Sequence, residues 1–536
     1  MEKIKQSWFV FLCAVILLGL TQLPYFLAFS SSSSGYVFGG FLINPLDGNS
    51  YLAKMYEGYR GDWTFTLPFT AQQGKGTFLY FFYILLGHLA RILNIPLIMT
   101  YHLARGICCL ILVWALSDFL ELFFKDKWAY RFALLFACFG AGMGWVLMPS
   151  GYVASDFWVA EAYPFLSSLV NPHFCLGISL MLWLIKVLII DYQPTMDLSK
   201  YIYVSAASLI LALLAPFAYV MVIVLLVISV AENIIGRLKE KQSLFTGKLL
   251  TNDWAIFCSL LGGIPVIAYE LYVMNSDPLL KGWQAQNITP SPPIWDFILS
   301  FSPLLILAIP AVVIVLRNKM NSWYPIIIWL IIGPICIYFP WSLQRRFFFG
   351  YFIPVVMLAV LTLQYVRSKA IEKRLVFNSI LAVVIICCIM TNMVLELTTV
   401  YGIQAKDPLL FLTTSESMAL SWINEYTPPD AIILASPQMG MFIPAQTGRR
   451  VIYGHPFETV NAENRKSEVT AFFEEFGSES AQPELEAYLK SNGVEYIFWG
   501  RRERLLCKNQ EDVLFIDDLL NPVFKDNEVI VFQVVQ

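Results

Sequence analysis

The stretch from which the organisation of the chain can be read is Phe41-Leu-Ile-Asn-Pro-Leu-Asp-Gly-Asn-Ser-Tyr-Leu-Ala53. It follows the first long apolar segment, Trp8 to Phe29, and carries an acidic residue, Asp47, just beyond that segment. Pro45 and Gly48 flank Asp47 and favour a turn. The remaining sequence predicts a membrane scaffold that presents this loop, followed by a small soluble domain.

The composition predicts a polytopic membrane protein. Of the 536 residues, 57% are hydrophobic and only 14% are charged, and the mean hydropathy is +0.63. Soluble domains carry roughly 25% charged residues. Many apolar runs approach the length of about 20 residues that a helix needs to cross a bilayer. The net charge of −3 gives no reason to expect nucleic acid as a partner.

Basic residues set the predicted orientation of the helices. Lys3 and Lys5 precede the first apolar segment, which is too long for a signal-peptide core, so we expect a retained helix and a cytoplasmic N-terminus. Four basic clusters are expected on the cytoplasmic side, at residues 125–131, 237–248, 317–319 and 367–374. Further apolar runs lie near residues 98–124, 129–148, 171–191, 254–274, 295–316, 323–341, 347–366 and 376–395.

Two other apolar regions complete a prediction of about eleven crossings. Tyr201 to Ile235 is too long for one crossing and contains Pro216, so it predicts two short helices. Residues 79–95 contain polar side chains, and a crossing there would place the cluster at 125–131 outside the cell. We therefore expect a helix that lies along the outer surface at 79–95.

This topology predicts that several polar segments share the outer side of the membrane. They are the loop with Asp47, residues 156–173, residues 275–293, the turn Gln344-Arg-Arg346 and everything after about Glu396. We expect a transmembrane domain over residues 1–400, with its first outer loop at 30–78, and a soluble extracytoplasmic domain over residues 401–536.

The C-terminal region predicts a compact α/β domain. Ser415 is a candidate N-cap for a helix that ends near Tyr426. Strand-like segments then alternate with helical patterns at residues 463–476 and 483–491. The predicted strands are Ala431–Ala435, Val451–Tyr453, Val494–Trp499 and Val529–Val535, the last in a hairpin that turns at Asp526-Asn527.

Two acidic residues are candidates for chemistry. Asp47 can serve as a general base for an acceptor hydroxyl or amine, although a solvated loop aspartate or a helix N-cap also fits its position. Glu57 and Asp62 follow in the same loop, so position alone does not single out Asp47. Glu161 lies among apolar residues, where a carboxylate is costly unless it is paired or used. It can orient an acceptor, hold a cation or pair with an arginine.

Two arginines, Arg345 and Arg346, stand between apolar runs on the predicted outer side, against the usual trend for basic residues. Guanidinium groups bind phosphate with bidentate geometry, so a lipid phosphate would explain them. Snorkelling to the headgroups, or pairing with Glu161 or Asp47, would explain them as well.

Other chemical motifs are sparse. The ten cysteines show no paired framework and no CxxC, so we expect neither a disulfide nor a zinc site. No Walker loop, HExxH or GxSxG is present. Gly448-Arg-Arg450 and Gly454-His-Pro-Phe-Glu458 look like loops at strand ends, where sites gather, although structural turns are the simpler interpretation. A divalent metal is left as an open alternative, with no metal ligand assigned.

Short segments distributed along most of the chain carry a resemblance to a known family. In the membrane part they are Asp47-Gly-Asn-Ser-Tyr-Leu-Ala53, Gly58-Tyr-Arg-Gly-Asp-Trp63 with Pro68, residues 79–87, Tyr101-His-Leu-Ala-Arg105, Gly140-Ala-Gly-Met-Gly-Trp145 and residues 161–173. In the tail they are Trp422, Pro428-Pro429-Asp430, Thr447-Gly-Arg-Arg450 and Tyr496 to Gly500. Together these segments resemble the bacterial members of the GT-C glycosyltransferase superfamily, polytopic enzymes that use polyprenyl-phosphate-linked sugars.

The resemblance implies a cell-membrane glycosyltransferase that moves a sugar from a polyprenyl-phosphate donor to an extracytoplasmic glycan, lipid or protein acceptor, with inversion. It implies that Asp47 is the catalytic base and Glu161 the second acidic position. Arg345 or Arg346 would meet the lipid phosphate. Substrate-binding roles are also implied for His173, Tyr51 and Arg105.

Two other functions stay open. A transporter or flippase for a lipid-linked substrate would also be polytopic, but such proteins tend to show internal repeats and charges within helices, and Lys186 is the one awkward charge inside an apolar run. A non-catalytic relative whose tail binds envelope glycan or a partner protein would keep the same layout.

Overall fold

The computed structural model describes residues 2–33, 35–190, 197–239, 248–370, 372–508 and 519–535. These residues form two compact units. Unit 1 comprises Met1–Leu23, Leu103–Glu270 and Thr289–Thr399, and unit 2 comprises Pro24–His102, Leu271–Ile288 and Val400–Gln536. Part of the basic cluster predicted at 237–248 lies outside the described residues.

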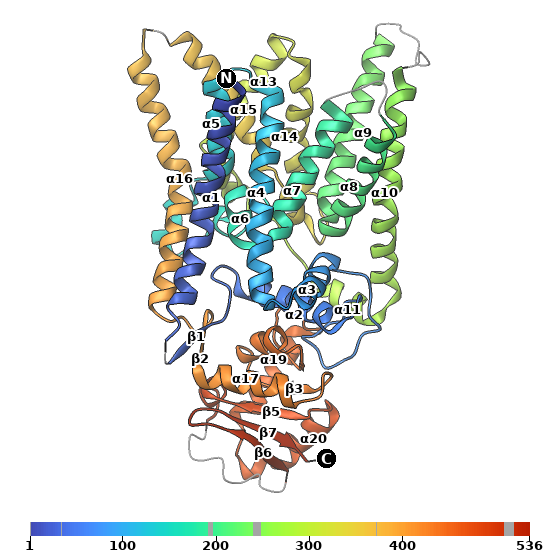
Figure 1. Cartoon of the computed structure of the whole chain (residues 1–536), viewed down its shortest axis with the longest axis vertical. Helices are drawn as coiled ribbons and strands as arrows, with labels where there is room; N and C mark the ends of the chain where they lie inside the picture. Colours follow the sequence, from blue (N-terminus) through green and yellow to red (C-terminus); the bar gives the residue numbers. More distant parts are fainter. Residues whose placement is uncertain are drawn as a thin grey trace. The chain divides into compact units, whose positions relative to one another are not determined.

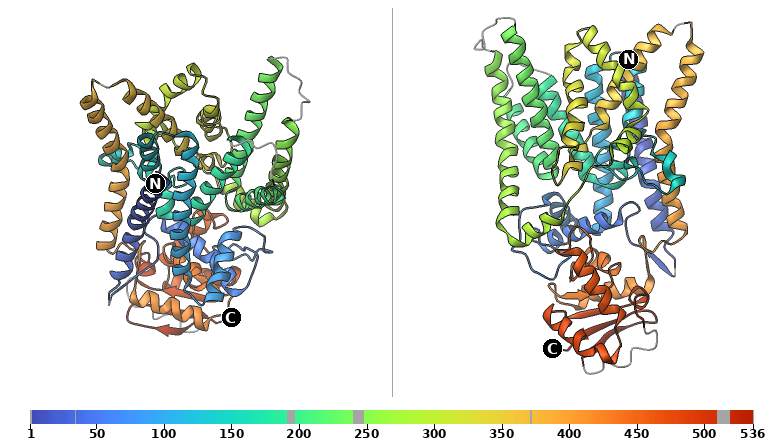
Figure 2. Two further views of the ribbon diagram at one scale, coloured as in Figure 1. Left: turned by 45° about the horizontal axis from the view of Figure 1, so that its top comes forward. Right: turned by 180° about the vertical axis from the view of Figure 1, so that it is seen from behind.

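Unit 1 is built from long apolar helices that run alongside one another (Figures 1 and 2). These helices are α1 (Glu2–Ser30), α4 (Leu97–Phe123), α5 (Lys127–Phe139), α7 (Pro172–Ile185), α8 (Leu198–Leu214), α9 (Pro216–Lys239), α10 (Lys248–Ser276), α13 (Leu304–Arg317), α14 (Tyr324–Ile337), α15 (Phe352–Lys369) and α16 (Arg374–Gln404). Four of them, α1, α4, α10 and α16, are divided between the two units.

Shorter elements connect these helices. They are α6 (Pro164–Val170), α12 (Ile294–Phe301), the 3₁₀ turns η1 (Gly144–Ser150), η2 (Ser155–Phe157), η4 (Asn321–Trp323) and η5 (Gln344–Phe348), and the π-helical turn η3 (Lys186–Ile190). The interior of unit 1 is formed around α15, which packs against α13, α5 and α14. Every residue of α15 from Phe352 to Leu363 is buried, as expected for a helix that is apolar all round.

Seven helices in the described residues are long and apolar enough to cross a membrane, or eight if α12 and α13 form one bent span. Together with the shorter apolar helices Leu198–Leu214, Pro216–Glu232 and Asn321–Ile337, these segments coincide with the predicted apolar runs. The class of polytopic helical membrane protein is therefore confirmed, and the number of crossings stays a prediction.

The break at Pro216 occurs as predicted, with α8 ending at Leu214 and α9 beginning at Pro216. Two runs that look continuous in the sequence are divided. Residues 129–148 split into α5 and η1, and residues 295–316 split into α12 and α13, which are bent by 82°. Lys186, the awkward charge, is paired with Asp118 at 2.7 Å.

Unit 2 contains a five-stranded sheet in the order β4-β3-β5-β7-β6, in which β3 is parallel to β4 and β5 while β7 is antiparallel to β5 and β6. Its strands are β3 (Ile432–Leu434), β4 (Arg450–Val451), β5 (Tyr496–Trp499), β6 (Leu520–Lys525) and β7 (Ile530–Val534). The predicted C-terminal α/β domain with its final hairpin is therefore present (Figure 1).

Helices cover this sheet. They are α17 (Thr414–Tyr426), α18 (Phe442–Thr447), α19 (Ala462–Glu474), α20 (Gln482–Ser491) and α21 (Arg501–Arg504), with the 3₁₀ turns η6 (Met439–Met441) and η7 (Glu479–Ala481). The predicted cap of α17 was wrong by two residues. Thr413 is the N-cap, because its side chain accepts from Glu416 N while the Glu416 side chain accepts from Thr413 N.

The first loop of the sequence also belongs to unit 2. It forms β1 (Tyr36–Phe38) and α2 (Pro45–Arg60), and the segment predicted as a surface helix at 79–95 forms α3 (Phe81–Leu93). β1 pairs with β2 (Phe411–Thr413) from the C-terminal region. The second segment of unit 2, Leu271–Ile288, carries α11 (Pro278–Gln286). α3 has 13 residues, about 20 Å of helix, which is shorter than a bilayer core of about 30 Å.

Two glycines let α2 and α3 cross closely. A Cβ on Gly58 would lie 1.9 Å from Ile84 O, and a Cβ on Gly87 would lie 1.9 Å from Met55 O. Each glycine therefore faces the backbone of the other helix. α2 also packs against α18, so this crossing and the C-terminal domain together fix the direction of the helix that begins beside Asp47.

Candidate active site

Asp47 occupies the first turn of α2. Asn44 is the N-cap residue, in a left-handed conformation with φ 48°, and its Oδ1 accepts from Asp47 N at 3.4 Å. Its Nδ2 group donates to Asp47 Oδ2 at 2.6 Å. The N-cap is thus Asn44 rather than Asp47. The helix dipole favours a carboxylate in this turn, and the Asp47 side chain is 39% exposed, so it is accessible to a substrate.

His455 faces Asp47 from the C-terminal region. Its Nε2 atom lies 3.6 Å from Asp47 Oδ1. Its Nδ1 atom accepts hydrogen bonds from the backbone N–H groups of Phe457 and Glu458, at 3.1 and 3.2 Å. Because Nδ1 is an acceptor, the neutral ring carries its proton on Nε2. The buried imidazole therefore presents an N–H to the carboxylate of Asp47.

The loop that carries His455 is held by hydrogen bonds on both sides. Thr459 Oγ1 accepts from the backbone N–H groups of Gly454 and His455, at 3.3 and 3.2 Å. Trp283 of α11 donates from Nε1 to Phe457 O at 2.7 Å. These bonds fix the position of the imidazole without help from Asp47.

A buried ion pair lies beside this loop. Lys54 of α2 is fully buried, and its Nζ group donates to Glu458 Oε1 and to Ser50 Oγ. Ser50 Oγ in turn donates to Glu458 Oε1. A buried charge pair is tolerated when it is hydrogen-bonded in this way. The pair joins α2, two turns beyond Asp47, to Glu458, whose backbone N–H donates to His455 Nδ1.

The charges in this cluster depend on one another. Burial alone would raise the pKa of Glu458, but Lys54 and His455 hold that pKa below its ordinary value. Burial lowers the pKa of Lys54, and the negative charges of Glu458 and Asp47 oppose this shift. Asp47, His455, Glu458 and Lys54 therefore form one electrostatic network, which we call the Asp47 network.

Aromatic rings enclose the lysine of the Asp47 network. Lys54 Nζ lies 4.0 Å from the centroid of the Tyr80 ring and 5.2 Å from that of Tyr51. Tyr51 stacks on Tyr83 with ring centroids 4.2 Å apart. Tyr51 thus forms part of the wall around Lys54, and its role in substrate binding stays a prediction.

Sequence reasoning did not assign Lys54, His455 or Glu458 to the site. One signal was available, because Asp47, Ser50 and Lys54 are spaced i, i+3 and i+7, which places them on one helical face. His455 and Glu458 belong to a segment already noted as a loop at a strand end. Their contact with α2 is long-range and leaves no local pattern.

Glu161 lies in a second cluster, within unit 1. Its Oε1 atom is 3.7 Å from both Arg345 Nε and Arg346 Nη1, and the carboxylate is buried. These distances indicate charge attraction rather than hydrogen bonds. The structure therefore brings together three of the predicted site residues, Glu161, Arg345 and Arg346. Pairing with Glu161 was one of the explanations left open for the two arginines, and the structure contains that pairing.

The turn with these arginines is tied to its surroundings. Arg345 N donates to Thr289 O at 3.3 Å, and Gly350 N donates to Glu161 O at 2.9 Å. The guanidinium carbon of Arg345 lies 5.2 Å from the centroid of the Trp158 ring. The side chains of Arg345 and Arg346 are 24% and 34% exposed. Both remain accessible to an anion.

Two further predicted residues lie elsewhere in the fold. Arg105 is fully buried on α4 and donates to three backbone carbonyls and one side-chain amide, those of Thr21, Ser168, Leu169 and Gln22. This arrangement ties α4 to α1 and α6. His173 is half-buried at the start of α7, with its ring centroid 4.2 Å from that of Phe174. Their substrate-binding roles stay predictions.

Another pair of buried carboxylates, Asp156 of η2 and Asp296 of α12, lies in unit 1. Asp156 Oδ2 accepts from Gly144 N at 3.0 Å and from Thr391 Oγ1 at 2.8 Å. Ser300 Oγ lies 2.7 Å from Asp296 Oδ1 and 3.4 Å from Asp156 Oδ1. Burial raises the pKa of Asp156 to about 6, against the effect of its hydrogen bonds.

The described ranges contain no group of three or more His, Cys, Asp or Glu side chains that could hold a metal ion. Asp47 and His455 together offer two such groups.

No protein-family model matches the sequence, and no curated protein matches it. Solved structures do match its fold. The archaeal oligosaccharyltransferase AglB from Archaeoglobus fulgidus aligns with a TM-score of 0.51 and 15% identity, over 93% of this chain and 70% of that one. ArnT from Cupriavidus metallidurans aligns with a TM-score of 0.52 and 12% identity, over 97% and 98% of the two chains.

The arabinofuranosyltransferase AftD from Mycobacteria aligns with a TM-score of 0.52 and 14% identity, over 99% of this chain and 40% of the longer AftD chain. These three proteins are GT-C glycosyltransferases. The chain therefore has the GT-C fold that the sequence resemblance implied. Identities this low establish the fold alone.

Proposed function

We propose that the chain is an integral membrane glycosyltransferase that transfers a sugar from a polyprenyl-phosphate donor to an extracytoplasmic acceptor, with inversion at the anomeric carbon. The observation that carries this proposal is the accessible Asp47 carboxylate, held at a helix start and faced by the buried Nε2–H of His455. The GT-C fold supports it. The matched AglB structure is a complex with dolichol-phosphate, and a polyprenyl-phosphate donor for this chain is our inference.

Asp47 acts as the general base. As the acceptor oxygen or nitrogen forms its bond to the anomeric carbon, its proton moves to an Asp47 carboxylate oxygen. The bond between the anomeric carbon and the phosphate oxygen breaks, and its electron pair leaves with polyprenyl phosphate. Attack opposite to the leaving group inverts the configuration. Because phosphate leaves as a stabilised anion, the reaction needs no strong general acid.

The rest of the Asp47 network positions the base. The Nε2–H of His455 faces Asp47 Oδ1 and attracts its negative charge, which helps to hold the carboxylate in place. At 3.6 Å it does not form a full hydrogen bond with Oδ1. The Glu458–Lys54 pair anchors the histidine loop to α2. We therefore assign His455, Glu458 and Lys54 as positioning residues.

In the same proposal, Arg345 and Arg346 bind the phosphate of the donor and hold its charge as it leaves. Glu161 is the second acidic residue. Its contacts with both arginines support a role in orienting the two guanidinium groups. Both arginine side chains are partly exposed, which supports access for a phosphate group.

We also propose the orientation that the basic clusters predict, with a cytoplasmic N-terminus and an extracytoplasmic C-terminal domain. A cysteine introduced at the exposed Ser480 should react with a membrane-impermeant thiol reagent added to intact cells. Reaction only after the cells are opened would reverse this orientation.

The function is tested by the release of free polyprenyl phosphate. Purified wild-type protein is given a panel of polyprenyl-phosphate sugars, with a crude envelope extract as the source of acceptor. Asp47→Asn should fold and bind lipid but release no polyprenyl phosphate above background. Asp62→Asn, which changes an exposed aspartate that follows α2, is the matched control and should stay active. Release by Asp47→Asn at the wild-type rate would refute the base assignment.

The same assay separates the alternatives. No release from any donor by the wild-type protein, with lipid still bound, would favour a transporter or a non-catalytic binding protein over a transferase.

A further inference from the structure

A groove crosses α17 on the C-terminal domain, away from every residue of the Asp47 network. It consists of two adjoining cavities of about 350 and 430 Å³, which share Val37, Ser417, Ser421 and Glu425 in their linings. The remaining lining residues come from α17 itself, from β1 and β2, and from single positions in β6 and α18. We call this feature the α17 groove.

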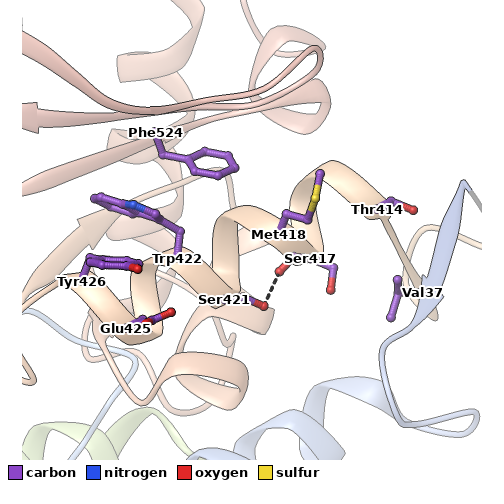
Figure 3. Close-up of a pocket in the computed structure, with 9 residues that line it drawn as sticks. All are labelled: Val37, Thr414, Ser417, Met418, Ser421, Trp422, Glu425, Tyr426 and Phe524. Atoms are coloured by element: carbon purple, nitrogen blue, oxygen red, sulfur yellow. Dashed lines mark hydrogen bonds between the residues drawn. The ribbon is translucent and has the colours of Figure 1, made fainter.

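Aromatic rings form one end of the α17 groove. Trp422 stacks on Tyr426 with ring centroids 5.6 Å apart and an angle of 24°, and Phe524 of β6 lies 6.1 Å from Trp422 on centroids (Figure 3). Trp422 is partly buried and packs against the core of the domain. Tyr426 is 62% exposed. The outermost ring of the stack therefore offers a rigid apolar surface to a ligand.

Polar groups line the groove next to these rings. Within the described part of the chain, no hydrogen bond involves the indole N–H of Trp422, the carboxylate of Glu425 or the carboxamide of Gln446. Asn424 Oδ1 accepts from Tyr56 O–H at 3.2 Å, so its Nδ2 hydrogens can still be donated. Ser417 and Ser421 add hydroxyl groups one helical turn apart (Figure 3).

The charge of the lining restricts the ligand. Neither cavity is lined by a lysine or an arginine, and Glu425 is the one charged side chain in either lining. A phosphate, sulfate or nucleic acid would find no counter-charge and would be repelled by the carboxylate. Along α17, whose backbone groups are bonded within the helix, an extended peptide would find no main-chain partners for strand pairing.

A neutral sugar fits these surroundings. Its ring has an apolar C–H face that packs on an aromatic ring, and hydroxyl groups around its edge that exchange hydrogen bonds with carboxylate, carboxamide and hydroxyl groups. We propose that the α17 groove binds a neutral glycan, with Tyr426 as the stacking surface and Glu425 as the principal hydrogen-bond acceptor. This inference rests on the proposed function, for which it names the acceptor as a carbohydrate.

The test measures binding with no donor present. Full-length protein in detergent is titrated by calorimetry with cellotetraose, mannotetraose and chitotetraose, and in parallel with a sulfated disaccharide and a short neutral peptide. At least one neutral tetrasaccharide should bind. Tyr426→Ala should weaken that binding about three- to tenfold, the usual value of one aromatic contact. Tyr426→Phe keeps the ring and should bind like the wild type.

Glu425→Gln should also weaken binding of that tetrasaccharide, while Glu484→Gln, an exposed glutamate of α20, should not. Tyr426 and Glu425 are exposed, so their substitution should leave the fold intact, which the unfolding temperature checks. The proposal is overturned if no neutral tetrasaccharide binds, if the peptide or the sulfated sugar binds instead, or if Tyr426→Ala and Glu425→Gln bind as the wild type does.

This outcome is separable from that of the proposed function. Glycan binding without release of polyprenyl phosphate from any donor would keep the glycan site and reject the transferase. Release by the wild type, with no neutral tetrasaccharide bound in the titrations, would keep the transferase and reject the glycan site.

Discussion

His455 Nε2 lies 3.6 Å from Asp47 Oδ1, although Asp47 lies near the start of the sequence and His455 lies in the C-terminal region. The Nδ1 atom of the imidazole accepts hydrogen bonds from two backbone N–H groups, and this holds the Nε2–H side of the ring toward the carboxylate. The separation exceeds a hydrogen bond. Asp47 Oδ1 therefore lies near an N–H group without being fully hydrogen-bonded to it, and it can still take a proton from an acceptor.

The two nitrogens of His455 can be tested separately. Asparagine places a carboxamide oxygen near the position of Nδ1, and glutamine places an amide N–H near that of Nε2. If Nε2–H supports the base, His455→Asn should fold but release polyprenyl phosphate about tenfold more slowly. His455→Gln should retain more activity than His455→Asn. Release rates and unfolding temperatures are measured for both.

A purely structural role for His455 would reverse that order. His455→Asn would then resemble the wild type, and His455→Gln would lose activity in proportion to its loss of stability.

The buried Lys54–Glu458 pair should show strong coupling. Lys54→Met leaves the Glu458 carboxylate buried without its counter-charge, and Glu458→Met leaves the ammonium group in the same state. Each single variant should lose roughly 3–5 kcal/mol of unfolding free energy. The double variant should recover most of that loss, because it buries no charge. Denaturant unfolding in detergent gives the coupling energy, and additive losses would show that the two side chains act independently.

Arg345 and Arg346 should control affinity for the donor phosphate. With both changed to glutamine, the purified protein should lose bound polyprenyl phosphate, and the donor KM should rise about tenfold or more, consistent with losing charge-assisted hydrogen bonds. Arg317→Gln, at the exposed end of α13, is the matched control. Unchanged lipid binding in the double variant would leave the arginines with no role beyond their pairing with Glu161.

Asp156 should make stability depend on pH. Its pKa is about 6 in the folded protein and 3.8 for an ordinary aspartate, so the folded state binds the proton more tightly. Stability should therefore fall as pH rises from about 4 to about 6 and stay low above that range. Asp156→Asn cannot ionise and should be more stable than the wild type at pH 7.5, by about 1–3 kcal/mol.

The two proteins should converge near pH 3.5, below the ordinary aspartate pKa of 3.8, where the carboxyl is mostly protonated in both the folded and the unfolded state. Unfolding temperatures at both pH values check this, with Asp430→Asn as a control for the removal of an exposed charge. A wild type that is the more stable of the two at pH 7.5 would contradict the prediction.

The class of fold could be predicted because it depends on local properties. Continuous apolar runs predict helices, and Pro216 removes the backbone hydrogen bond that would have joined α8 to α9. The bend between α12 and α13 escaped this reasoning because hydropathy stays high across it. The backbone packs closely beside that bend, because a Cβ on Gly142 would lie 1.8 Å from Ser300 O. Such packing depends on tertiary contacts, which hydropathy does not record.

The candidate site was predictable in part for a similar reason. Position after the first helix made Asp47 a candidate together with Glu57 and Asp62, and the family resemblance selected Asp47. The cost of burying a carboxylate predicted that Glu161 would be paired or used. That cost does not identify the partner of Glu161. Pairing with an arginine was only one of several roles that the sequence allowed for this residue. His455 and Glu458 meet α2 through contacts between distant segments, which no local pattern records.

Unit 2 is made of three separate stretches of chain, and this has a consequence for the order in which the protein is synthesised. α2 emerges from the ribosome early, whereas Glu458 and His455 are added near the end. Until then, Lys54 has no carboxylate to neutralise it, and β1 has no β2 to pair with. The nascent chain can thus insert its helices one after another while its proposed base stays unassembled, and activity should begin only when translation is almost complete.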